Sequence, residues 1–160
     1  MLTHKSSVYI VMLIVSHRDK RMKQQNTKDI MMQQTVALAL KMPVKASQQR
    51  LAAICFDRKG KALGRGVNSY TRTHPLQKHF AILAGMSEEK TFLHAELSAV
   101  LRSRDKEIHT IFVARVLKDD TISLAKPCKA CSQMLKSFGV QKVVYTITKE
   151  CYVEQNIENL

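Results

Sequence analysis

Hydrophobic positions change their spacing several times along the chain, and each spacing predicts a type of element. Short apolar runs bounded by turn residues are typical of strands. We expect such strands over residues 51–57, 61–68, 110–115 and 140–146. Apolar residues spaced three or four positions apart are typical of amphipathic helices. We expect such helices over residues 29–42, 94–102 and 128–138.

Turn and stop residues separate these elements. Arg58-Lys59-Gly60 predicts a turn between the first two strands, and Asp119-Asp120 predicts one after the third. Pro43 ends the first helix, and Gly139 is suited to the C-terminal end of the last. The order helix, strand, strand, helix, strand, helix, strand predicts an α/β sandwich whose sheet carries helices on both faces.

Two further segments lack a clear periodic pattern. Residues 69–79 are polar and contain histidines, so we expect a loop there. The C-terminal segment carries Glu150, Glu154 and Glu158, and we expect a short helix or a frayed end.

The N-terminal residues differ from the rest of the chain. The apolar run from Val8 to Val15 is far shorter than the ~20 residues of a membrane span, and no small-residue cleavage site of a signal peptide follows it. Residues 18–26 are polar and aperiodic, which predicts a solvated linker. Our hypothesis is that residues 1–28 form a poorly ordered extension, translated from an upstream start codon, and that residues 29–160 form the domain. We expect no membrane association.

Composition narrows the class of protein. The 160 residues correspond to one domain, and 45% hydrophobic with 24% charged residues exclude collagen-like, coiled-coil and wholly disordered chains. The 26 Lys and Arg residues against 13 Asp and Glu residues give a net charge of +13. This charge favours phosphate-bearing partners such as nucleotides, nucleic acid or an anionic membrane surface. Aromatic residues make up only 6%, which leaves few platforms for stacking successive bases.

Cysteine usage indicates metal or redox chemistry in a reducing compartment. The chain has 4 cysteines, too few for the dense framework of a secreted disulfide protein. Cys128 and Cys131 form a Cys-x-x-Cys pair, which in the cytoplasm is typical of metal or redox sites. Cys55 lies between Ile54 and Phe56 and is expected to be a buried core thiol.

Two motifs combine into a candidate metal centre. His94-Ala95-Glu96 begins one predicted helix, and Pro127-Cys128-Lys129-Ala130-Cys131 begins another. Both helices follow loops, so their N-termini can meet at one end of the sheet. His94, Cys128 and Cys131 would give Zn²⁺ three ligands and leave the fourth tetrahedral position open for water, as in catalytic sites. Glu96 would then lie near that water as a proton acceptor and donor.

Each motif alone has more ordinary explanations. A lone Cys-x-x-Cys also occurs in structural zinc sites and redox proteins, and most His-x-Glu pairs are ordinary helix residues. A structural zinc site would need a fourth ligand, and none is evident nearby. The order of the two motifs, each at the start of a helix, favours a catalytic zinc site.

His-x-Glu followed by Pro-Cys-x-x-Cys resembles the signature of the zinc-dependent nucleobase deaminases. The resemblance extends from about Asp29 to Lys149 and is strongest to the cytidine and deoxycytidylate deaminase branch, particularly short phage and bacterial members. It implies a three-layer α/β/α sandwich with a central mixed sheet. It also implies hydrolytic deamination, with Glu96 as the catalytic residue and homo-oligomeric assembly.

The resemblance and the residues close to the two motifs suggest substrate contacts. Gly66-Val67-Asn68 through Thr73-His74-Pro75 matches a family segment whose Asn binds sugar or base, so Asn68 is a candidate. Phosphate contacts are suggested for His74 and Lys126, although a solvated His74 explains the pattern equally well. Phe92 is a candidate for stacking on the base or for packing at the helix start. The full set of expected substrate-binding residues is Asn68, His74, Ala95, Phe92 and Lys126.

Departures from the family patterns refine the expected substrate. Adenosine deaminases of tRNA usually carry Glu before the Pro-Cys, where this chain has Lys126. Polynucleotide cytosine deaminases usually have aromatic-rich loops near the metal, and this chain has few aromatic residues there. We therefore expect a (deoxy)cytidine nucleotide or nucleoside, of the deoxycytidine monophosphate type. The alternatives are deamination of cytosine in single-stranded DNA or RNA, which the charge of +13 favours, and a zinc-stabilised nucleic-acid-binding module without catalysis.

Overall fold

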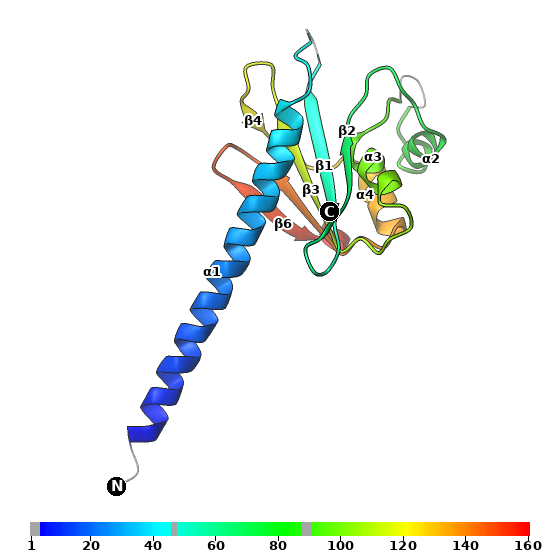
Figure 1. Ribbon diagram of the computed structural model, residues 1–160. Helices are drawn as coiled ribbons and strands as arrows, with labels where there is room; N and C mark the ends of the chain where they lie inside the picture. The colour runs from blue at the N-terminus through cyan, green and yellow to red at the C-terminus, as the bar shows by residue number, and fades with distance from the viewer. Residues whose placement is uncertain (1–3, 46–47, 88–90) are drawn as a thin grey trace. The chain divides into compact units, whose positions relative to one another are not determined.

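The computed structural model describes residues 4–45, 48–87 and 91–160 (Figure 1). The first three residues of the predicted extension lie outside this part. The chain divides into two compact units, Met1–Met31 and Met32–Leu160. None of the described helices is long and apolar enough to cross a membrane.

A six-stranded mixed sheet forms the centre of the second unit. Its strands are β1 (Arg50–Phe56), β2 (Ala62–Val67), β3 (Thr110–Val116), β4 (Ile122–Ser123), β5 (Lys142–Thr146) and β6 (Tyr152–Asn156). Their order is β2-β1-β3-β5-β6, with β4 paired to the end of β3. β3 and β5 are parallel and the other pairs are antiparallel. A parallel pair needs a crossover connection, and here that connection contains α4.

Three helices cover one face of this sheet. They are α2 (Pro75–Leu83), α3 (Ala95–Arg102) and α4 (Lys129–Ser137). Their buried residues, including Phe80, Leu97 and Met134, form one core with Ala53 and Val113 of the sheet. Figure 1 shows α3 beside β2.

The opposite face of the sheet is covered by the end of α1 (His4–Leu40). Within the second unit, Ala39 packs with Ala52 and Val116, and all three are fully buried. Successive strand residues point to opposite faces, which is why Ala52 and Ala53 belong to different cores. Helices on both faces of a mixed sheet confirm the predicted three-layer α/β/α sandwich.

Two glycines on β2 allow α3 to lie directly on the sheet. A Cβ atom added at Gly64 would overlap the carbonyl oxygen of Ala99, and one at Gly66 would overlap the backbone of Ala95 and Ala99. Helix α3 can therefore lie this close to β2 only because the two glycines have no Cβ atom.

The N-terminal part of the chain differs from the sequence prediction. Residues 18–26 belong to the long helix α1 instead of a linker. This segment contains no Gly or Pro, and its Lys, Arg, Gln and Met residues have good helix propensity. The lack of periodic apolar residues in this segment indicates that it is exposed to solvent, and an exposed segment can still be helical.

Two other segments were also predicted wrongly. The expected loop 69–79 contains the start of α2, with Pro75 in the first turn, where its missing N–H costs nothing. The C-terminal tail forms strand β6, paired with β5, before a 3₁₀ turn at Ile157–Asn159. Tyr152-Val153-Glu154-Gln155 is too polar for a strand buried on both faces, but it suits an edge strand. The short strand β4 was not anticipated at all.

Candidate metal centre and adjoining cavity

The first half of the site lies at the N-terminus of α3. His94 is the residue that caps this helix, with extended backbone, and its side chain makes no capping hydrogen bond. The preceding segment is held by two backbone hydrogen bonds, from Ser69 N to Leu93 O and from Leu93 N to Arg72 O, each 2.9 Å. The imidazole of His94 is therefore left free to point toward other groups.

The second half lies at the N-terminus of α4. Cys128 caps this helix without a side-chain capping bond, and Cys131 follows in its first turn. The loop before Cys128 is anchored by a 2.9 Å hydrogen bond from Ala125 N to Thr146 O of β5. Ser132 Oγ donates to Cys128 O at 3.0 Å. Both sulfurs thus stand at the positive end of a helix dipole, which favours thiolates.

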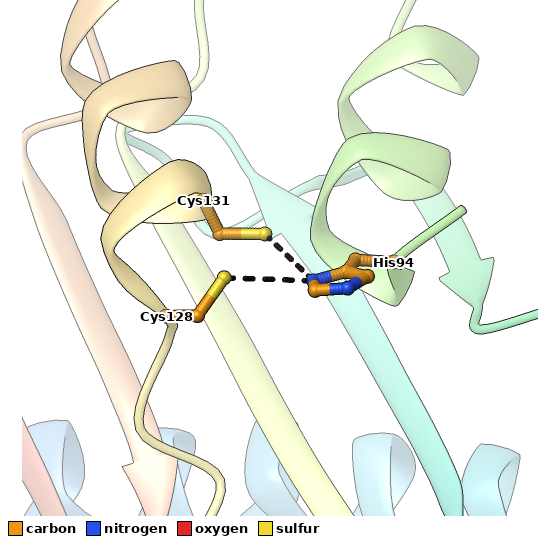
Figure 2. Close-up of side chains that lie close together, drawn as sticks. All are labelled: His94, Cys128 and Cys131. Carbon is orange, nitrogen blue, oxygen red and sulfur yellow. Dashed lines mark hydrogen bonds between the residues drawn. The ribbon is translucent and has the colours of Figure 1, made fainter. Parts of the chain in front are cut away.

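The two helix ends meet, as the motifs predict. Figure 2 shows the imidazole of His94 directed at both sulfurs. Its Nδ1 lies 3.3 Å from Cys131 Sγ and 3.6 Å from Cys128 Sγ. All three donor atoms lie within 4.8 Å of one another.

These separations fit a tetrahedral zinc ion. With Zn–S bonds of ~2.3 Å and Zn–N bonds of ~2.05 Å, sulfur and nitrogen ligands at the tetrahedral angle lie ~3.5 Å apart. The two observed Nδ1–sulfur distances lie on either side of this value. Two thiolates and one imidazole are also the donor types that zinc prefers. The residues present therefore fit zinc.

The pKa values of the three donor groups are shifted in different ways. A hydrogen bond from Cys131, followed by one from His94, lowers the pKa of Cys128 to about 4. The pKa of Cys131 is raised well above its ordinary value, mainly by that hydrogen bond to Cys128 and by burial. The pKa of His94 is raised, chiefly by its hydrogen bond with Cys128. The hydrogen bond between the two sulfurs therefore shifts the pKa of Cys128 and the pKa of Cys131 in opposite directions.

Glu96 lies in the first turn of α3, with only 3% of its surface exposed. Its Oε2 atom is buried and has no hydrogen-bond partner within the described part of the chain. Burial raises the pKa of this carboxyl group, and the neighbouring His94 opposes the shift. A buried acceptor without a partner is costly, so its presence indicates that an additional group binds to it.

A cavity of about 330 Å³ adjoins the cluster. Of the residues that the sequence singled out, Asn68, Phe92, Ala95, Glu96 and Lys126 line it together with His94 and Cys128. The side chain of Asn68 is held in place by β1, because it accepts from Leu51 N at 2.8 Å and donates to Gln49 O at 3.0 Å.

His74 has a different position. Its side chain caps α2, and its Nδ1 accepts a hydrogen bond from Leu76 N at 3.2 Å. It is absent from the described residues that line the cavity.

Two cavity residues, Tyr70 and Gln77, were not singled out from the sequence. Tyr70 lies near Phe92, with ring centroids 6.2 Å apart, and its hydroxyl donates to Gln49 O at 3.2 Å. Gln77 reaches the site from α2 and is 3% exposed. Both lie in the segment that was predicted as a polar loop. The apolar spacing of Leu76 and Phe80 is the signal that could have identified a helix and therefore a buried face.

A Cys₂His donor set beside a buried carboxyl group, at two helix N-termini of an α/β/α sandwich, is typical of zinc-dependent hydrolytic enzymes. The family model for the cytidine and deoxycytidylate deaminase zinc-binding region matches residues 25–147. The chain therefore belongs to this deaminase family, and its cofactor is zinc.

Solved structures of deaminases resemble the chain. Cytidine deaminase from Burkholderia pseudomallei has a TM-score of 0.56 at 18% identity, covering 80% of this chain and 91% of that one. Cytidine deaminase from Mycobacterium leprae gives 0.51 at 16% identity, with the same coverages of 80% and 91%. The apo dCMP deaminase of cyanophage S-TIM5 gives 0.49 at 20%, covering 77% and 84%. The first two similarities show a shared fold. A comparison with curated protein sequences gave no significant match.

Proposed function

We propose that this chain converts cytosine to uracil in a free (deoxy)cytidine nucleotide or nucleoside, with a deoxycytidine monophosphate-type substrate. The observation that carries the proposal is the buried, unpartnered Oε2 of Glu96, which lies in the cavity beside the Cys₂His cluster. A carboxyl oxygen in that position can exchange protons with a bound base.

In this proposal His94 Nδ1 and the sulfurs of Cys128 and Cys131 would hold the metal. When bound, zinc supplies Lewis acidity that makes water a nucleophile near neutral pH. Glu96 is not needed as a ligand and stays free for proton transfer.

Glu96 moves two protons in turn. It accepts one from the attacking water and delivers it to ring N3, so that C4 becomes electrophilic and bonds to the water oxygen. It then takes the second proton of that oxygen to the exocyclic amine. The C4–N bond breaks, ammonia leaves and a carbonyl group remains at C4. Burial supports this role because it raises the pKa of Glu96, and a carboxyl group with a raised pKa holds a proton more readily between the two transfers.

The cavity supports a small substrate. Its volume of about 330 Å³ is at the lower end for small-molecule sites. Tyr70 and Phe92 supply aromatic surface for a base. Lys126 is the only Lys or Arg among the described lining residues, and its side chain is exposed. A cation in such a position is suited to bind the phosphate group of a nucleotide.

The test is ammonia release by the zinc-loaded protein. The panel contains cytidine, deoxycytidine, their monophosphates, adenosine and a cytosine-containing single-stranded oligonucleotide. We expect turnover of the free cytosine compounds, with the monophosphates preferred. Glu96→Gln should lower turnover by about 10²–10⁴-fold and keep its zinc, since the residue moves protons without binding the metal. Substantial turnover by Glu96→Gln, or loss of its zinc, would contradict the assigned role.

A pair of lysine variants tests the phosphate contact. Lys126→Gln should raise KM for the monophosphate about tenfold and leave deoxycytidine unaffected, because one charge-assisted contact is lost. Lys129→Gln is the matched control, an exposed lysine nearby that is absent from the cavity lining. Equal effects of the two variants would place the phosphate elsewhere. Turnover confined to the oligonucleotide would instead favour the polynucleotide substrate that the charge of +13 suggests.

A further inference from the structure

Gln77 stands apart among the cavity residues because it contacts two ligand-bearing segments at once. It lies on α2, outside both sequence motifs, and is 3% exposed. Its Oε1 accepts a hydrogen bond from the backbone N–H of His94 at 3.1 Å. A hydrogen bond from its amide group also opposes the rise in the pKa of Cys131.

The chemistry of a primary amide suits both contacts. The oxygen accepts from a backbone N–H, while the nitrogen donates to sulfur, and the group stays neutral throughout. His94 precedes α3, and its side chain makes no capping bond. The contact to Gln77 therefore helps to fix the backbone of His94, and with it the position from which the imidazole extends. A thiolate ligand accepts N–H hydrogen bonds readily, and such contacts orient metal ligands.

The position of Gln77 also links three helices. His94 belongs to the start of α3, Cys131 to the first turn of α4, and Gln77 to α2. The other hydrogen bonds between the two motif segments in the described part of the chain join His94 to the two cysteines and Glu96 to Cys131, so all of them are made by the metal ligands and the buried carboxyl group.

We propose that Gln77 is a positioning residue that uses one amide group to hold His94 and Cys131 at the spacing that zinc requires. The inference rests on the metal site of the proposed function, and it extends that site beyond its three ligands. A merely structural role would require only that Gln77 fill space and satisfy its own polar atoms.

The test compares Gln77→Met with Gln133→Met. Met keeps the length of the side chain and removes both amide contacts. Gln133 is the matched control because it lies on α4, two positions after Cys131, with an exposed side chain. Zinc affinity is measured by competition with a chromogenic chelator, and the cobalt-substituted proteins are compared by their thiolate-to-cobalt charge-transfer absorption.

We expect Gln77→Met to weaken zinc binding about 10–100-fold and to shift the charge-transfer band, while Gln133→Met matches the parent protein. If Gln77→Met lowers only the melting temperature of the metal-free protein and leaves affinity and absorption unchanged, the proposal is overturned. Both readouts are independent of turnover, so a failure of the proposed deaminase activity would not be mistaken for a failure of this inference.

A second variant covers the case in which Gln77→Met does not fold. Gln77→Glu keeps an oxygen acceptor for His94 N–H and replaces the donor to Cys131. It should fold, bind zinc more weakly than the parent protein and show the shifted cobalt band. Parent-like affinity in this variant would rule out the contact to Cys131 as a contributor.

Discussion

Cys128 and Cys131 are neighbours in one helical turn, yet their protons are held very differently. Hydrogen bonds lower the pKa of Cys128 to about 4, whereas the pKa of Cys131 is raised well above its ordinary value. His94 also holds its proton more tightly than usual, because its pKa is raised by Cys128. Zinc needs both sulfurs as thiolates and the imidazole neutral, so binding must displace protons from Cys131 and, at lower pH, from His94.

Zinc affinity should therefore rise with pH. Protons compete with the metal for the same donor atoms, so each proton released contributes about tenfold per pH unit. We expect the proton of Cys131 to be displaced throughout the range from pH 6 to pH 8, and the slope to steepen toward pH 6, where protonation of His94 adds to it. Chelator competition across this range measures it. Cys55→Ala is the control, because that buried thiol lies outside the cluster and should leave the slope unchanged. A flat profile would show that both sulfurs are already ionised and that the imidazole of His94 is already neutral.

His74 allows a capping role to be separated from a substrate contact. Its Nδ1 is used by Leu76 N–H, so we expect His74→Ala to lower stability by about 1 kcal/mol and to leave KM unchanged. His74→Asn should keep stability close to that of the parent protein, since Asn is a strong N-cap residue. Thermal unfolding and steady-state kinetics measure the two effects. A raised KM in both variants, with normal stability, would instead support the phosphate contact that the sequence suggested.

At the level of elements, the site depends on how closely α3 approaches β2. The residues that carry chemistry, His94 and Glu96, lie at the end of α3 that packs over Gly66. A helix is close to rigid over one turn, so moving this end of α3 moves both side chains together.

Gly66→Ala should damage stability and metal binding at once. The added methyl group would overlap the backbone of Ala95 and Ala99, which forces α3 outward and costs about 1–3 kcal/mol. Denaturant unfolding and chelator competition are the measurements. Gly139→Ala is the control, since its positive φ costs about 1 kcal/mol but the new methyl group meets open space. Normal zinc affinity in Gly66→Ala would mean that α3 tolerates the shift.

Helix α2 was not predicted because a polar segment stands immediately before it in the sequence. The segment Thr71-Arg72-Thr73-His74-Pro75 is polar, and it led to the expectation of a loop through residue 79. The helix begins within this stretch, and its buried residues Gln77, Phe80 and Ala81 face the core. Gln77 can be buried because its polar atoms have partners at His94 and Cys131, which belong to other helices. The local sequence around Gln77 contains no sign of these partners.

At the scale of the whole molecule, the cavity is built by the second unit alone. Its described lining residues run from Leu51 to Ala130, and the first unit ends at Met31. We keep residues 1–28 as a proposed extension on this basis, and we propose homo-oligomeric assembly on the family resemblance.

A protein shortened to residues 29–160 should therefore fold and function. We expect its melting temperature, zinc content and turnover to match those of the full chain, because the lining residues and the described core residues all lie beyond residue 28. Calorimetry and metal analysis of both forms test this. Aggregation or zinc loss in the shortened protein would show that the N-terminal residues support the domain.

The sequence alone was sufficient for the parts of this protein that depend on local spacing. The strands 51–57 and 110–115 were found within one residue of β1 and β3, because apolar runs between turns are a local signal. The group of His94, Cys128 and Cys131 was also found, since each motif lies at a helix N-terminus and helix starts have local signatures.

Tertiary structure decided which distant residues meet. The pairing of β6 with β5 and the position of Tyr70 and Gln77 at the cavity depend on contacts between separate elements. Such contacts follow from the packing of complete helices and strands, and a short window of sequence does not contain the partner. The same limit explains why the donor types of the metal centre could be predicted, while the side chain that bridges two of its ligands could not.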